Sequence, residues 1–248
     1  MSQEICRCPV CGHDFKQDAP RAYNASIHPA VRQKILDRSL FQFNCPRCST
    51  ALSGWFPFVY MDMEHAFILY FFDNPAAATP YVEADQAAHP HYVRRVVCDH
   101  NSLLEKLHIL EAGLDDRIIM YLCYQTWVFW KQVLASAEHI AQLPLSPADR
   151  DRLMAAAPIR VQSVHFIRMT DAQIELVLIN DKHLGLPVTL PQSDYVNAGR
   201  ALASAGIAGD INSCVTINNT WATAVARRCS EGAADPCVRF GLDKTAAV

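Results

Sequence analysis

The 248-residue sequence has only nine glycines and contains no Gly-rich phosphate-binding loop. It also lacks the G-x-S-x-G motif of serine hydrolases and the H-E-x-x-H motif of zinc proteases. These absences exclude the enzyme classes that such motifs define. If the chain has a catalytic activity, its residues are not gathered in a standard motif.

Long apolar runs are missing as well. The apolar stretch after Arg117 reaches Lys131 before the roughly 20 residues that a membrane-spanning helix needs, so we expect no membrane segment. The first residues, Met1 to Glu4, lack the basic-then-apolar order of a secretory leader. We therefore expect a cytoplasmic protein, where closely paired cysteines favour metal binding over disulfides.

Two short motifs stand out among the ten cysteines. Residues 8–12 read CPVCG, and residues 45–49 read CPRCS. In each motif a proline fixes φ at the start of a tight turn, and a glycine after the second cysteine permits the left-handed conformation that ends it. Ser49 takes the glycine position in the second motif, so we expect that turn to be slightly strained or differently hydrogen-bonded.

The four cysteines of these motifs predict one tetrahedral metal site with Cys8, Cys11, Cys45 and Cys48 as ligands. Zinc is the favoured metal, with a Zn–S distance of about 2.3 Å, and iron is the alternative because rubredoxin-type centres use similar turns. A closed shell of four sulfurs leaves no position for water or substrate, so the predicted role is structural. Cys6 is an alternative ligand, a redox-sensitive neighbour or, as we expect, a small apolar residue.

Nucleic-acid binding is a common role of zinc ribbons, but the charge of this region gives it little support. The whole chain carries a net charge of −3, and residues 1–50 hold seven Lys or Arg and four Asp or Glu, a formal +3. A zinc ion with four thiolates contributes about −2, which leaves about +1. Nucleic acid is therefore an unlikely partner and stays a minor alternative.

The pattern along the chain predicts an α+β fold in which zinc-ribbon-type antiparallel hairpins are combined with packed helices. A short helix is expected to start at Pro29. The stretch 73–90 contains three prolines and six alanines and is expected to be a loop. Strands are expected at residues 4–8, 40–45, 55–61, 65–72 and 92–98, the third and fourth forming a hairpin.

Two helices are expected in the middle of the chain. Ser102 and Glu105 form a capping-box pattern at the start of the first, and Gly113 suits its left-handed end. Asp115 and Asp116 suit the start of the second helix because the helix dipole favours negative charge there.

The second of these helices is expected to run to about Ile140 and is apolar most of the way round. Such a helix is covered on two sides, either between the two halves of the chain or at a subunit contact. Trp127 and Trp130 are the residues expected to contact a protein partner or a second copy of the chain.

The Pro-containing stretch 143–147 predicts a boundary between a metal-binding domain, residues 1–142, and a smaller C-terminal α+β region, residues 143–248. The C-terminal region is expected to contain a short helix from Ser146, strands at 161–169, 173–179 and 188–190, and helices at 195–207 and 221–228.

Beyond the cysteines, several segments of residues 5–137 resemble the CpXC family of bacteria and archaea. They are residues 40–46 (LFQFNCP), 59–62 (VYMD), 94–97 (RRVV), 103–106 (LLEK) and 112–117 (AGLDDR). The resemblance implies a zinc-ribbon α+β domain. It implies no reaction, because this family has no established biochemical activity.

Three functional hypotheses follow from the sequence. The first is a structural zinc protein that serves as an interaction or assembly module. The second is an enzyme with a cleft between the two halves, in which Asp62, His65 and Asp116 would be the polar groups. The third is a nucleic-acid-binding zinc ribbon.

Overall fold

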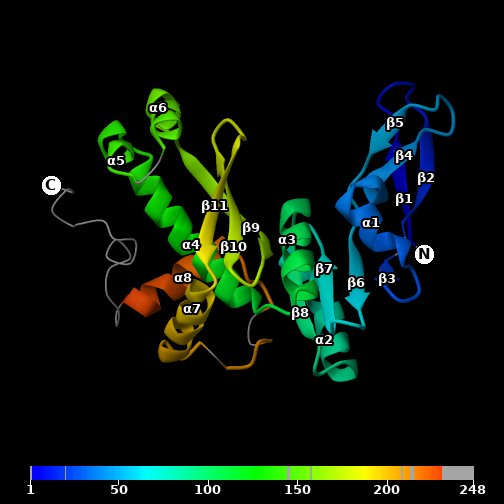
Figure 1. Ribbon diagram of the computed structural model, residues 1–248. Coiled ribbons are helices and arrows are strands. Elements are labelled where there is room, and N and C mark those ends of the chain that lie inside the picture. The colour runs from blue at the N-terminus through cyan, green and yellow to red at the C-terminus, as the bar shows by residue number, and fades with distance from the viewer. Residues whose placement is uncertain are drawn as a thin grey trace. The chain divides into compact units, whose positions relative to one another are not determined.

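The computed structural model describes residues 2–19, 21–143, 146–156, 158–207, 209–212 and 215–230. The chain divides into two compact units, Met1–Gly113 with Asn212–Thr216, and Leu114–Ile211 with Ile217–Val248. Each unit combines helices with β-sheet, which confirms the predicted α+β class (Figure 1). The predicted domain boundary after residue 142 stays a prediction about parts that fold independently.

The first unit is built on a four-stranded mixed sheet in the order β3-β6-β7-β8. Its central strands β6 (Phe58–Asp62) and β7 (Phe67–Phe71) pair antiparallel, as the predicted hairpin requires. The edge strands β3 (Ala22–Asn24) and β8 (Val93–Val97) run parallel to β6 and β7, respectively.

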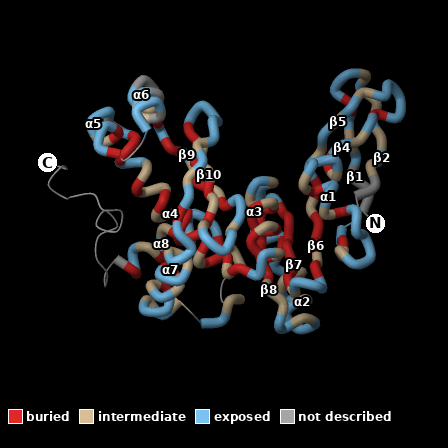
Figure 2. Tube along the Cα trace, viewed as in Figure 1, coloured by how far each residue is buried: buried red, intermediate tan, exposed pale blue. Residues whose placement is uncertain are grey.

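Both faces of this sheet are covered, so its central strands are almost wholly buried (Figure 2). On one face, Phe58, Tyr60 and Leu69 pack with residues of α1 (Ala30–Leu36) and α3 (His100–Glu111). On the other face, Val59 and Ile68 pack with residues of α2 (Pro75–Ala88). Burial on both faces explains why these strands are continuously apolar rather than alternating.

Two further hairpins of the first unit carry the cysteine motifs (Figure 1). One pairs β1 (Ser2–Arg7) with β2 (Asp14–Ala19). The other pairs β4 (Gln42–Asn44) with β5 (Ala51–Ser53), and a short 3-10 helix η1 (Ser39–Phe41) precedes β4. The strand expected at 40–45 is therefore shorter than predicted.

The loop predicted at 73–90 is wrong, because residues 75–88 form α2. The side chain of Asn74 caps this helix by accepting a hydrogen bond from the N–H of Ala76 at 2.9 Å, and Pro75 occupies the first turn, where no N–H is needed. The alanines, which have the highest helix propensity, outweigh the cost of Pro80 inside the helix.

The predicted start of α3 at Ser102 is also wrong. Asp99 is the N-cap, and its carboxylate accepts hydrogen bonds from the N–H of Ser102 at 2.9 Å and from the Ser102 hydroxyl at 2.6 Å. The helix thus begins at His100, since the stronger acceptor of the two lies three residues upstream. The predicted end is confirmed, because Gly113 has a φ of +66°.

The second unit contains a three-stranded antiparallel sheet in the order β11-β10-β9, which confirms the predicted hairpin and third strand. The strands are β9 (Val161–Met169), β10 (Gln173–Asn180) and β11 (Gly185–Pro191). Its helices are α4 (Asp116–Val133), α5 (Ala137–Ala141), α6 (Pro147–Ala156), α7 (Ser193–Ser204) and α8 (Asn219–Ser230).

Helix α4 is covered inside its own unit, where it contacts β9, α7 and α8. It ends at Val133, not at Ile140 as predicted. The reason is a new helix start at Ser136, whose hydroxyl oxygen accepts a hydrogen bond from the N–H of His139 at 3.2 Å and caps α5. In the described part of the chain, no helix is long and apolar enough to cross a membrane.

Candidate metal centre

The two cysteine motifs fold into turns with the same backbone hydrogen bonds. In the first, the N–H of Gly12 donates to the carbonyl of Cys8 at 3.0 Å, and the N–H of Cys8 donates to the carbonyl of His13 at 2.9 Å. In the second, the N–H of Ser49 donates to the carbonyl of Cys45 at 2.8 Å, and the N–H of Cys45 donates to the carbonyl of Thr50 at 2.9 Å. Each turn therefore holds its two thiols on one side of a hairpin end.

The departure at Ser49 changes the strain of the second turn but not its hydrogen bonds. Ser49 has a φ of +59°, close to the +69° of Gly12. A left-handed conformation costs a non-glycine residue roughly 1–2 kcal/mol. The second turn therefore has the expected backbone strain at Ser49. The other expectation, a different hydrogen-bonding pattern, is wrong.

The structure brings all four predicted ligands together, with their Sγ atoms within 4.8 Å of one another. The Sγ atoms of Cys8 and Cys48 lie 3.7 Å apart, as do those of Cys11 and Cys45. In a tetrahedron with Zn–S bonds of about 2.3 Å, the sulfur–sulfur edge is about 3.8 Å. The cluster therefore fits a tetrahedral ion, and Cys6 is not part of it.

The surroundings of the thiols lower some pKa values and raise others. The hydroxyl of Thr50, 3.1 Å from the Sγ atom of Cys48, is the main reason why the pKa of Cys48 falls to about 6. The backbone N–H of Cys11 lowers the pKa of Cys8. The backbone at His13 alone would lower the pKa of Cys11, but burial and the three neighbouring sulfurs raise it to about 12.

Four thiolates whose Sγ atoms lie within 4.8 Å of one another repel each other unless a positive charge lies between them. A divalent cation supplies that charge, and its binding releases the remaining thiol protons. Thr50 is the one participant that sequence reasoning missed. No sequence pattern marks it, because a single hydroxyl two residues after a cysteine is common.

Two short hairpins joined through four sulfurs define a four-cysteine ribbon, a class of metal-binding module. Compared with known families, residues 6–122 match the family described as CpXC protein. The resemblance expected from the sequence is thus confirmed for this part of the chain. Neither the curated proteins nor the solved structures give a match.

The structure also brings together two of the three residues suggested for an enzyme. Asp62 is buried at the end of β6, and its carboxylate lies 2.9 Å from Nδ1 of His65. The same carboxylate accepts hydrogen bonds from the N–H groups of Glu64 and His65. These bonds close the turn between β6 and β7, so the hairpin by itself accounts for the pair.

Asp116, the third residue of that hypothesis, belongs to the second unit and is fully buried in the first turn of α4. Its neighbour Asp115 is the N-cap and accepts a hydrogen bond from the N–H of Arg117 at 2.9 Å. The Arg117 guanidinium lies 2.7 Å from the same carboxylate and also donates to the carbonyls of Ile207 and Gly209. The two aspartates thus begin a helix, as predicted.

Proposed function

We propose that the chain is a cytoplasmic zinc-binding protein in which the metal is structural and the folded surface acts as an interaction or assembly module. The sulfur–sulfur distances of 3.7 Å carry the metal part of this proposal. Four thiolates suit zinc better than any other common divalent ion, and they leave no open coordination position for a reaction.

The identity of the metal is tested on the purified protein. We expect close to one zinc ion per chain by elemental analysis, and a colourless protein. A visible absorbance with stoichiometric iron would replace zinc by iron, and the absence of both metals would refute the site. Cys48→Ser should lose the metal. Cys6→Ser is the matched control and should keep the metal, because Cys6 lies on β1 but is not part of the cluster.

A structural role follows from how little else holds the two hairpins. Isolated two-stranded hairpins are marginal in water, and β4 and β5 have no fully buried residue. Cys8 and Cys45, both at 1% exposure, are the buried residues of the two cysteine motifs. The sulfur cluster therefore substitutes for a hydrophobic core at this end of the unit.

Hydrogen exchange with and without a chelator tests this role. We expect chelation to abolish amide protection in residues 2–19 and 42–53 and to leave β6 and β7 protected, because their core contains no metal ligand. If the hairpins keep their protection in the metal-free protein, the structural role is wrong.

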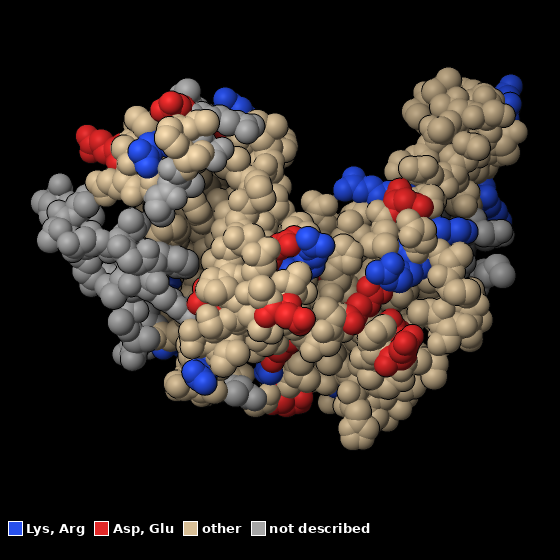
Figure 3. All heavy atoms as spheres, in the orientation of Figure 1, with Lys and Arg blue, Asp and Glu red and all other residues tan. Residues whose placement is uncertain are grey.

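Trp130 supports the interaction part of the proposal. It is half-buried beside a small cluster of Phe129, Val133 and Leu143, so part of its ring remains available to a partner. On the face shown in Figure 3, Lys and Arg side chains stand among Asp and Glu side chains, which favours a protein partner over nucleic acid.

Sedimentation of the wild type, Trp130→Ala and a control, Trp55→Ala, tests self-assembly. We expect a wild-type oligomer that Trp130→Ala weakens and the control does not. A wild type that stays monomeric at high concentration would refute self-assembly through this helix.

A further inference from the structure

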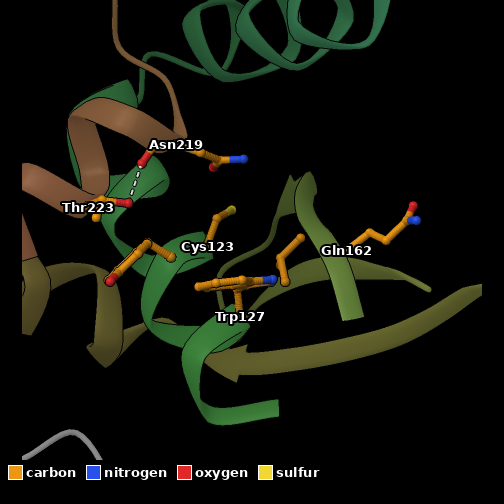
Figure 4. Close-up of a pocket in the computed structure, with 7 residues that line it drawn as sticks. Cys123, Trp127, Gln162, Asn219 and Thr223 are labelled. Atoms are coloured by element: carbon orange, nitrogen blue, oxygen red, sulfur yellow. Dashed lines mark hydrogen bonds between the residues drawn. The ribbon is translucent and has the colours of Figure 1, made fainter. Parts of the chain in front are cut away.

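The second unit contains an open cavity of about 240 Å³ between α4, β9 and α8. In Figure 4, Trp127 lies beside Cys123 of the same helix, with Asn219 on α8, while the side chain of Gln162 on the facing strand extends away from Trp127. Tyr124 also lines the cavity, and its ring centroid is 5.9 Å from that of Trp127. Three elements that are distant in the sequence thus meet around one aromatic ring.

The ring of Trp127 is held in place from two directions. Its indole N–H donates to the carbonyl of Val161 at 3.2 Å, which fixes the ring against β9. The ammonium of Lys131 lies 4.6 Å from the ring centroid. Within α4, Lys131 lies one turn after Trp127 and Cys123 lies one turn before it. The lysine and the cavity wall at Cys123 are therefore on opposite sides of Trp127 along the helix. A fixed ring of this kind is a stacking platform.

The polar side chains that line the cavity include two solvent-exposed amides, those of Gln162 and Asn219, which have no hydrogen-bond partner among the described residues. Each offers both a donor and an acceptor. The hydroxyl of Thr223, by contrast, is already used, because it donates to the backbone carbonyl of Asn219 at 2.8 Å. An amide of this type pairs with two adjacent groups on the edge of a heterocycle, one donor and one acceptor.

Size and charge restrict the ligand further. The cavity is smaller than the roughly 300–1,000 Å³ of typical drug-sized sites, so it accommodates one or two fused rings. None of the side chains that line it is charged. An ionic ligand would lose its hydration without gaining a counter-charge from the lining residues, and the ammonium of Lys131 already interacts with the ring of Trp127.

We propose that this cavity binds an uncharged, planar heterocycle of one or two rings, stacked on Trp127 and hydrogen-bonded at its edge by Asn219. Adenine is the probe that matches this chemistry, because it presents a donor and an acceptor side by side. Binding here is independent of the metal centre, which lies in the other unit.

Equilibrium dialysis of the full chain with adenine tests the proposal. We expect saturable binding at one site, weaker binding of purine, which lacks the exocyclic amine, and weaker binding of the anionic AMP. Base–aromatic stacking is worth enough that Trp127→Ala should weaken adenine binding roughly tenfold or more, whereas Trp127→Phe should retain most of it. Trp55→Phe, in the other unit, is the matched control and should bind like the wild type.

Asn219→Ala keeps the test valid if Trp127→Ala perturbs the fold, because Asn219 is exposed at the start of α8 and its side chain has no hydrogen-bond partner among the described residues. We expect it to weaken adenine binding several-fold and to reduce the preference for adenine over purine. The proposal is overturned if adenine shows no saturable binding up to its solubility limit. Binding that is unchanged in both Trp127→Ala and Asn219→Ala, or AMP binding tighter than adenine, would also overturn it.

Discussion

The two cysteine turns provide an internal comparison of backbone strain. Gly12 and Ser49 occupy the same position, with φ values of +69° and +59° and the same hydrogen bond to the carbonyl of the first cysteine. A Cβ at position 12 would have no atom within 4 Å. The Ser49 side chain is exposed and has no hydrogen-bond partner among the described residues. Replacing Gly12 by alanine or Ser49 by glycine therefore changes the conformational energy of the backbone and little else.

Two opposing terms set the magnitude. The left-handed conformation costs a non-glycine residue roughly 1–2 kcal/mol. Glycine costs about 0.4–1 kcal/mol through the greater freedom of the unfolded chain. The difference is about 1 kcal/mol. We predict that Ser49→Gly stabilises the metal-bound ribbon by this amount and that Gly12→Ala destabilises it by a similar amount.

Because folding of the ribbon and metal binding are coupled, the same difference appears as a roughly fivefold change in apparent metal affinity. Competition with a chelator of known affinity measures it. Ser49→Gly should hold the metal more tightly than the wild type, and Gly12→Ala less tightly. The double variant, with glycine at 49 and alanine at 12, should return close to the wild-type value. A loss of affinity in Ser49→Gly would refute the reasoning, since it would show that the serine hydroxyl stabilises the turn.

Three further predictions concern the first unit. Pro80→Ala, at an exposed position inside α2, should raise the unfolding free energy by about 1–2 kcal/mol in urea titration, and a decrease would show that the proline fits the helix without cost. The hydrogen bond with Asp62 raises the pKa of His65 above 6.5. The wild type should therefore be more stable than His65→Gln, with the full difference in unfolding free energy below pH 6.5 and a smaller one as the pH rises through the raised pKa. A difference that grows with pH would contradict this. Phe58→Ala, at a fully buried position of β6, should cost about 3–5 kcal/mol, and a cost below 1 kcal/mol would mean that the core refills the space.

The cluster of four cysteines was predictable because the pattern that produces it is local. Each C-P-x-C turn specifies its own geometry, and only the meeting of the two hairpins required the fold. Even the strain at Ser49 followed from one residue in the glycine position. Thr50 was not predicted, since a single hydroxyl next to a cysteine carries no distinctive pattern.

Helix α2 shows where local patterns compete. Its prolines suggested a loop, yet Pro75 lies in the first turn, where proline is favourable, and Pro80 is tolerated in a helix rich in alanine. At the start of α3, two side chains competed as the cap. Asp99 prevailed over Ser102 because its carboxylate accepts from both the backbone and the hydroxyl of Ser102.

The cavity in the second unit could not be predicted from the sequence, for a different reason. Its walls come from residues 123–127, 162–164 and 219–223, and no spacing along the chain relates these segments. Only the pairing of β9 with β10 and the contacts of α4 with β9 and α8 bring them together. Sites of this kind depend on tertiary packing alone, whereas a cysteine turn is specified by five consecutive residues.

The apolar helix α4 separates the two tryptophans that the sequence treated as one contact surface. Because β9, α7 and α8 of the same unit all contact the helix, its apolar character does not require a second copy of the chain.

The N–H of Trp127 donates to the carbonyl of Val161 and its ring lines the cavity, so Trp127 has a role without any partner. Trp130, one turn away beside Phe129, has no such use and is the residue left for association. We therefore predict that Trp127→Ala weakens adenine binding roughly tenfold or more without changing the oligomeric state. Trp130→Ala should change the oligomeric state and leave adenine binding intact. If both variants change both properties together, the helix acts as one surface and the separation of roles is wrong.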